Sequence, residues 1–157
     1  MKTLAGHTGD DSPLAPAVTR TSVSAMTQEL RTFLTFQGGA ATDALDLYRD
    51  VFDDFELIEI DHYGPDDGGP EGTVKVARFR LANSEFSCAD SPVDHAWSFT
   101  PGVSLWIECD DVDELQRLFD RLSDGGQVFM PLDDYGFSTR FGWVGDRHGV
   151  TWQLNLR

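Results

Sequence analysis

The sequence predicts an α+β fold in which two βαβββ modules in one chain form curved, mostly antiparallel sheets around a cup. Strand-like and helical patterns follow one another in the order strand, helix and three strands, and this order occurs twice. A ferredoxin-like fold is the alternative, but each of its units has one strand fewer. The residues also repeat at an offset of 70 positions, which places Phe36 on Trp106, Leu45 on Leu115, Tyr48 on Leu118 and Phe52 on Leu122.

The first module is expected at about residues 28–90. Residues 28–36 alternate in hydrophobicity and predict a strand, which Gly38 and Gly39 end. Residues 40–52 predict a helix, because Ala41, Leu45 and Tyr48 recur on one helical face. Strands are expected at 55–63, 73–81 and 84–90, with a Gly- and Asp-rich turn at 64–72 and a tight turn at 82–83.

The second module is expected at about residues 102–157. It consists of strands at 102–108, 127–130, 137–144 and 150–156, and a helix at 110–122 with Leu115 and Leu118 inward. The last strand is the clearest, because Val150, Trp152 and Leu154 alternate with polar residues. The Gly- and Asp-containing segment 145–149 suits the tight turn of a hairpin.

Residues 1–27 predict a disordered tail, since they are rich in Gly, Ser, Thr, Pro and Ala without periodicity. The remainder, 28–157, predicts one domain. The net charge of −15 disfavours nucleic acid and anionic membranes as partners. The two cysteines, Cys88 and Cys109, lack CxxC spacing, which favours buried free thiols in a reducing cytoplasm.

Three segments carry a family resemblance: FLTFQGGAATDALDLYRDVF, SFTPGVSLWIECDDVDELQRLFDRLSDGG and MPLDDYGFSTRFGWVGDRHGVTWQLNL. In this order they resemble PhnB-like proteins, a branch of the vicinal oxygen chelate superfamily that includes glyoxalase I, bleomycin-resistance proteins and dioxygenases. The resemblance covers residues 31–157 and implies the glyoxalase/bleomycin-resistance fold with a cup in each pair of modules.

The resemblance also implies where a metal ion would lie. Metal-dependent members place a His near the start of the first strand of a module and a Glu on the last strand. These positions fall on Phe33, Val103 and Gln153, with Ser87 as the counterpart in the first module. None of these side chains is a strong metal ligand. We therefore expect no metal and no cofactor.

The resemblance implies which alternate side chains of each strand face the cup. These side chains predict a mostly apolar ligand pocket. Either Phe141 and Trp143 or Arg140 and Gly142 point inward, and we favour a site with Arg140. A filled core is an equally open interpretation of the same side chains. The expected pocket residues are Phe33, Thr35, Gln37, Ser87, Val103, Leu105, Arg140, Trp143, Thr151 and Gln153.

The sequence therefore predicts a metal-free protein that binds an unidentified small molecule. The alternatives are a glyoxalase- or dioxygenase-type enzyme, the 3-demethylubiquinone methyltransferase activity often attached to PhnB-like sequences, and a structural module without a ligand. The superfamily and the exposed sheet edges also imply a homodimer. The segment from Trp97 to Phe99 is the expected contact between its subunits.

Overall fold

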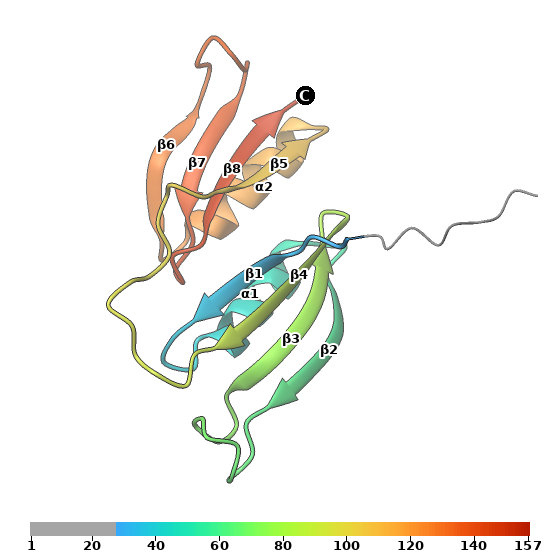
Figure 1. The fold of residues 1–157 in the computed structure, drawn as a ribbon. Helices are drawn as coiled ribbons and strands as arrows, with labels where there is room; N and C mark the ends of the chain where they lie inside the picture. Colours follow the sequence, from blue (N-terminus) through green and yellow to red (C-terminus); the bar gives the residue numbers. More distant parts are fainter. Residues whose placement is uncertain (1–27) are drawn as a thin grey trace, which may run out of the picture.

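The computed structural model describes residues 28–157, so the tail predicted at residues 1–27 lies outside the described residues. The predicted element order is confirmed, because each half of the chain is a βαβββ module (Figure 1). The first module contains β1 (Thr32–Phe36), α1 (Ala41–Val51), β2 (Glu56–His62), β3 (Val74–Leu81) and β4 (Ser84–Asp90).

The second module repeats this architecture. Its elements are β5 (Leu105–Cys109), α2 (Val112–Ser123), β6 (Gln127–Asp133), β7 (Phe141–Gly145) and β8 (Thr151–Leu156). The sheets have the strand orders β1-β4-β3-β2 and β5-β8-β7-β6, and in each the first pair is parallel and the others antiparallel. Strands β1 and β5 are thus equivalent edge strands.

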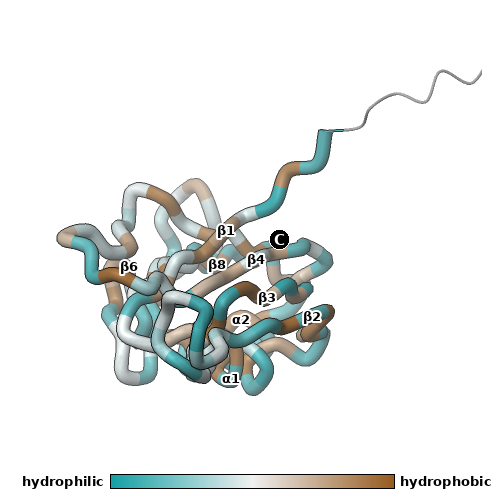
Figure 2. Tube along the Cα trace, turned by 60° about the horizontal axis from the view of Figure 1, so that its bottom comes forward, coloured by the Kyte–Doolittle hydropathy of each residue, from teal (hydrophilic) through white to brown (hydrophobic). Residues whose placement is uncertain are grey.

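Both helices lie on the same side of the two sheets (Figures 1 and 2). Hydrophobic and hydrophilic residues are intermixed along the strands, because successive side chains point to opposite faces (Figure 2). The hydrophobic ones pack against the helices, where Tyr48 of α1, Phe79 of β3 and Trp152 of β8 are fully buried. The opposite side of the sheets, which we call the open face, carries no helix (Figure 1).

A buried carboxylate joins the two modules. Asp146, in the β7–β8 turn, accepts hydrogen bonds from Tyr48 Oη of α1 and from Trp152 Nε1 of β8, both at 3.0 Å. Its other oxygen accepts the backbone N–H groups of His148 and Val150, which closes the turn. Burial of Tyr48, and next the negative charge of Asp146, raise the pKa of the Tyr48 phenol. The first helix is thereby bonded to the second sheet.

The two helices are also joined by arginine side chains. Arg117 of α2 donates to the carbonyl of Val51 at 2.7 Å, and Arg121 donates to the carbonyl of Asp50 at 3.2 Å. These carbonyls belong to the last turn of α1, where no intrahelical donor is available and a cation is favoured. No helix within residues 28–157 is long and apolar enough to cross a membrane.

Candidate functional site

The open face of the first module is a mixture of apolar and ionic groups. One row across the sheet joins Phe33 to Ser87 and Ser87 to Arg78, which forms an ion pair with Glu59 at 3.2 Å. In the neighbouring row, Arg80 pairs with Glu56 and Glu85. Most charges on this face are therefore already neutralised by a cross-strand partner.

The open face of the second module is aromatic. Trp106 of β5 lies beside Gln153 of β8, which lies beside Trp143 of β7. The Trp106 ring is also 5.6 Å from that of Phe141, and Phe137 packs on Phe141 at 5.1 Å. Nearly half of the Trp106 surface and 65% of the Phe137 surface are exposed. A cluster of exposed aromatic side chains of this kind makes this face a candidate binding surface.

The register of the sheets corrects the position expected to match Phe33. Phe33 pairs with Ser87 in the first module, and the equivalent pair in the second module is Trp106 with Gln153. Val103 precedes β5, and the side chain of Leu105 lies on the helix side, beside buried Trp152. The spacing between strand and helix core causes this shift of three residues, because Leu45 follows the end of β1 at Phe36 by nine residues, whereas Leu115 follows the end of β5 at Cys109 by six.

The residues at these positions do not fit the divalent metal of the superfamily. Phe33 and Trp106 carry no ligand atom of imidazole, carboxylate or thiolate type, and Ser87 and Gln153 offer only a hydroxyl and a neutral amide. No group of three or more His, Cys, Asp or Glu side chains within residues 28–157 is arranged to hold a metal ion. We therefore derive no chemical step that depends on a metal.

A cavity of about 250 Å³ gathers four of the ten expected pocket residues. It lies where β1 approaches β5 and β8, under the connection between the modules, and we call it the seam cavity. Thr151 is fixed there by a hydrogen bond from its hydroxyl to the carbonyl of Val103 at 2.7 Å. The cavity is lined mainly by apolar groups with a few hydroxyls: Thr32, Phe33, Leu34, Ser98, Phe99, Thr100, Val103, Leu105, Val150 and Thr151.

The other six expected pocket residues lie outside the seam cavity. Arg140 donates to Gln116 of α2 at 2.8 Å, so its guanidinium lies on the helix side and not in the cup. Gln37 bonds to the backbone of Trp97 and His95 and fixes the connection between the modules. Of the others, Ser87, Trp143 and Gln153 lie on the open faces, and Thr35 lies on β1 next to the Phe33 row.

Sequence reasoning missed Trp106 and Glu108 as open-face residues. Glu108 accepts hydrogen bonds from Asn155 at 2.7 Å and Trp106 Nε1 at 2.6 Å, and these bonds lower the pKa of its carboxyl. The segment VSLWIEC could have identified them, because Trp106 alternates in step with the polar residues Ser104 and Glu108, which are expected on the solvent-facing side of a strand. The aliphatic residues of the segment occupy the alternate positions, which identifies those positions as the side that faces the helix.

The two thiols are unsuited to nucleophilic chemistry. Cys88 and Cys109 are both free and buried. Burial, with a further contribution from nearby carboxylates, raises the pKa of each thiol to about 12. Because the thiolate is the reactive form, these cysteines act as small hydrophobic residues at neutral pH.

Comparison with known proteins identifies related chains. The family model described as 3-demethylubiquinone-9 3-methyltransferase matches residues 28–155. The PhnB protein of Bacillus cereus is 42% identical, and its solved structure superposes with a TM-score of 0.79 over 83% of this chain and 100% of that one. A glyoxylase/bleomycin resistance protein/dioxygenase domain from Frankia has the same fold, with a TM-score of 0.59 at 15% identity over 84% of this chain and 98% of that one.

Protein YjdN of Escherichia coli is 29% identical over 87 residues, which are 55% of this chain. The chain therefore matches only 58% of the length of this curated relative.

Proposed function

We propose that this chain, which belongs to the 3-demethylubiquinone-9 3-methyltransferase family of PhnB-like proteins with the glyoxalase/bleomycin-resistance fold, binds a small and largely apolar molecule without a metal ion. One observation carries the proposal. The positions at which the fold would place metal ligands hold Phe33, Trp106, Ser87 and Gln153, a set that favours apolar contact over coordination.

The seam cavity supports this ligand class. Its volume of about 250 Å³ is slightly below the range of about 300–1,000 Å³ that is usual for ligand sites, which indicates a small ligand. Phe33 and Val103 lie at the cavity with 55% and 78% of their surfaces exposed, so a ligand would bury apolar area that water now covers. The hydroxyls of Thr32, Ser98 and Thr100 can orient a polar group on the ligand.

The methyl transfer in the family's description has weak support in this chain. Gly38 and Gly39 precede α1 with positive φ angles, as glycines of a cofactor-binding turn would. However, the first amide of α1, Ala41 N–H, donates to the buried carboxylate of Asp90 at 3.0 Å. The place at which such a turn holds an anionic cofactor group is thus taken by the protein's own side chain. S-adenosylmethionine does not fit here, and we derive no step through it.

The protein is also proposed to be a homodimer whose second copy covers the part of the second module's open face around Phe137. Phe137 leaves 65% of its surface in water there and does not line the seam cavity, and burial of such area drives association. Within the expected contact segment, Trp97 is 54% exposed and supports the proposal, whereas Phe99 packs on buried Phe36 at 5.3 Å.

A sedimentation measurement at low and near-molar salt tests the dimer. We expect twice the subunit mass of 17.4 kDa at high salt, where the charge of −15 on each copy is screened. A monomer at both salt concentrations contradicts the proposal.

The two free buried thiols further support a reducing, cytoplasmic location.

A thermal-shift screen with neutral aromatic and aliphatic compounds tests ligand binding. A compound at a hundred times its Kd is expected to add about 2.7 kcal/mol to the free energy of unfolding. Val103→Asp is expected to abolish this effect, because it places a charge at the mouth of the cavity. Val93→Asp is the matched control, since Val93 is also exposed but does not line the cavity. An equal response of both variants, or the failure of every compound to stabilise the protein, contradicts the proposal.

A further inference from the structure

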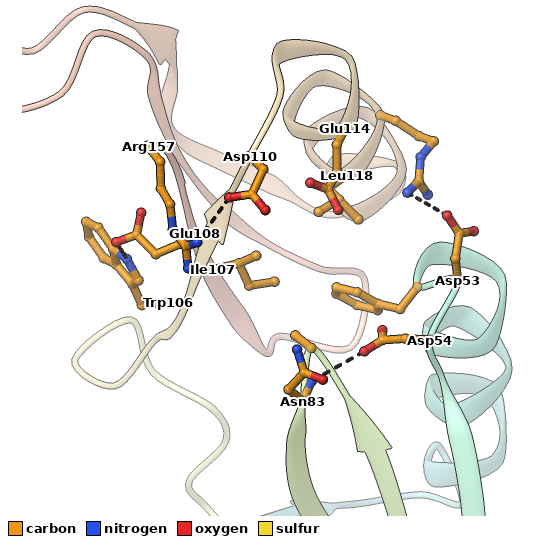
Figure 3. Close-up of a pocket in the computed structure, with 13 residues that line it drawn as sticks. Asp53, Asp54, Asn83, Trp106, Ile107, Glu108, Asp110, Glu114, Leu118 and Arg157 are labelled. Carbon is orange, nitrogen blue, oxygen red and sulfur yellow. Dashed lines mark hydrogen bonds and ion pairs between the residues drawn. The ribbon is translucent and has the colours of Figure 1, made fainter.

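A second cavity, of about 470 Å³, lies where the two modules meet at the far end of β5 (Figure 3). Its walls come from β5, from α2, from the segment after α1 and from the turn between β3 and β4. Neither the family nor the proposed ligand site accounts for this cavity. We call it the end cavity.

The accessible apolar surface of the end cavity comes mainly from the half-exposed ring of Trp106 on its rim and from the partly buried side chain of Ile107. Phe52 and Leu118 also line the cavity, but they are only 5% and 2% exposed. Because β5 is the edge strand of its sheet, one row of its peptide groups faces away from β8. A bound molecule could therefore meet an aromatic face, aliphatic side chains and backbone carbonyls together.

The rim of the end cavity is acidic. Arg117 and Arg157 also line it, but Arg117 pairs with Asp53 and Arg157 pairs with Asp110 (Figure 3). Three further carboxylates line the cavity without an ion-pair partner among residues 28–157: Asp54, Glu108 and Glu114.

These charges also act on a neighbouring group. Burial raises the pKa of the Cys109 thiol, and the carboxylates of Glu114, Asp111, Glu108 and Asp110 raise it further. Glu108 itself is held in place by Trp106 and Asn155, so that its charge stays beside the indole ring. The end cavity therefore combines a hydrophobic surface with a negative potential.

We propose that the end cavity binds an organic cation, in which an ammonium or amidinium group is attached to an aromatic or alkyl body. The body would pack on the exposed ring of Trp106 and on Ile107, and the cation would lie among the unpaired carboxylates of the rim. An inorganic cation would leave the apolar surface in water, and an anion would be repelled. This complementarity of charge and hydrophobicity selects one class of ligand.

Three probes with the same phenyl ring test the proposal on the full-length protein. These are 2-phenylethylamine, which is cationic at neutral pH, 2-phenylethanol, which is neutral, and phenylacetate, which is anionic. Titration calorimetry at 0.15 M salt, on the order of physiological ionic strength, is expected to show binding of the amine at least about tenfold tighter than that of the alcohol. No binding of phenylacetate is expected.

Two double variants locate the site. Asp54→Asn with Glu114→Gln removes two carboxylates of the rim. Each lost charge is expected to weaken amine binding about threefold, which gives about tenfold for the double variant. Asp66→Asn with Glu71→Gln removes the same charges from the exposed turn at 64–72 and is expected to leave binding unchanged.

Equal affinity for amine and alcohol would overturn the proposal, because the carboxylates would then contribute nothing. An equal loss of binding in both double variants would also overturn it, since the amine would then be a general counterion. If the ligand screen on the seam cavity fails while the amine binds as expected, this inference stands on its own.

Discussion

Replacement of Asp146 by alanine is expected to lower the free energy of unfolding by about 3–5 kcal/mol. The carboxylate accepts four hydrogen bonds, and two of the donors are the buried side chains of Tyr48 and Trp152. Without Asp146, each of these two donors remains buried without a partner, at a cost of about 1–3 kcal/mol. The β7–β8 turn also loses its two side-chain bonds.

Tyr48→Phe measures the contribution of the bond between the modules separately from that of the bonds that close the β7–β8 turn. It removes one donor, keeps the ring and leaves the other three bonds of Asp146 intact, so a loss of about 1.5 kcal/mol is expected. In the double variant the two effects should not add, because both changes remove the same bond. Asp66→Ala, on the exposed 64–72 turn, is the matched control and should change stability by less than about 0.5 kcal/mol.

Urea unfolding followed by tryptophan fluorescence measures these differences, since Trp152 is itself a partner of Asp146. A loss below about 1 kcal/mol for Asp146→Ala would refute the reasoning. Additive losses in the double variant would show that Tyr48 and Asp146 do not act through a shared bond.

Two further predictions concern the thiols and the glycines. Cys88 and Cys109 of the folded protein should react slowly with a thiol reagent at pH 8, because a pKa of about 12 keeps them protonated. Both should react fast in denaturant. Fast reaction of the folded protein would contradict their burial. Gly126→Ala should destabilise the protein by about 3 kcal/mol or more, because its Cβ would overlap with the carbonyl oxygen of Gly145. Gly38→Ala, where no atom lies within 4 Å of the added Cβ, should cost only about 1 kcal/mol for its positive φ, and similar thermal denaturation of both variants would count against the close approach.

The repeat predicted the fold well but not the register of the strands. Leu115 and Leu118 are buried at the positions that their counterparts Leu45 and Tyr48 occupy, because helix packing preserves the spacing along each helix. The offset fails in the strands, where the shorter connection before α2 changes which residues face the helices. Phe36 is buried and Trp106 is half exposed, although the offset pairs them.

Which alternate side chains around β7 face the cup was ambiguous for a different reason. Both alternating sets contain residues that could face either side, and the positive charge of Arg140 favoured the cup. Gly142 was the better guide, since a Cβ there would lie 2.7 Å from the Phe119 ring of α2. A glycine in a strand often marks the close approach of another element, and here that element is the helix.

Metal analysis of the purified full-length protein tests the central claim most directly. We expect no stoichiometric zinc, nickel, iron or manganese, and no change in the unfolding transition after dialysis against a chelator. Phe33, Trp106, Ser87 and Gln153 supply neither imidazole nor carboxylate, whereas a catalytic site needs about three such ligands. About one metal ion per chain, lost on Gln153→Ala, would contradict the account and indicate a metalloenzyme.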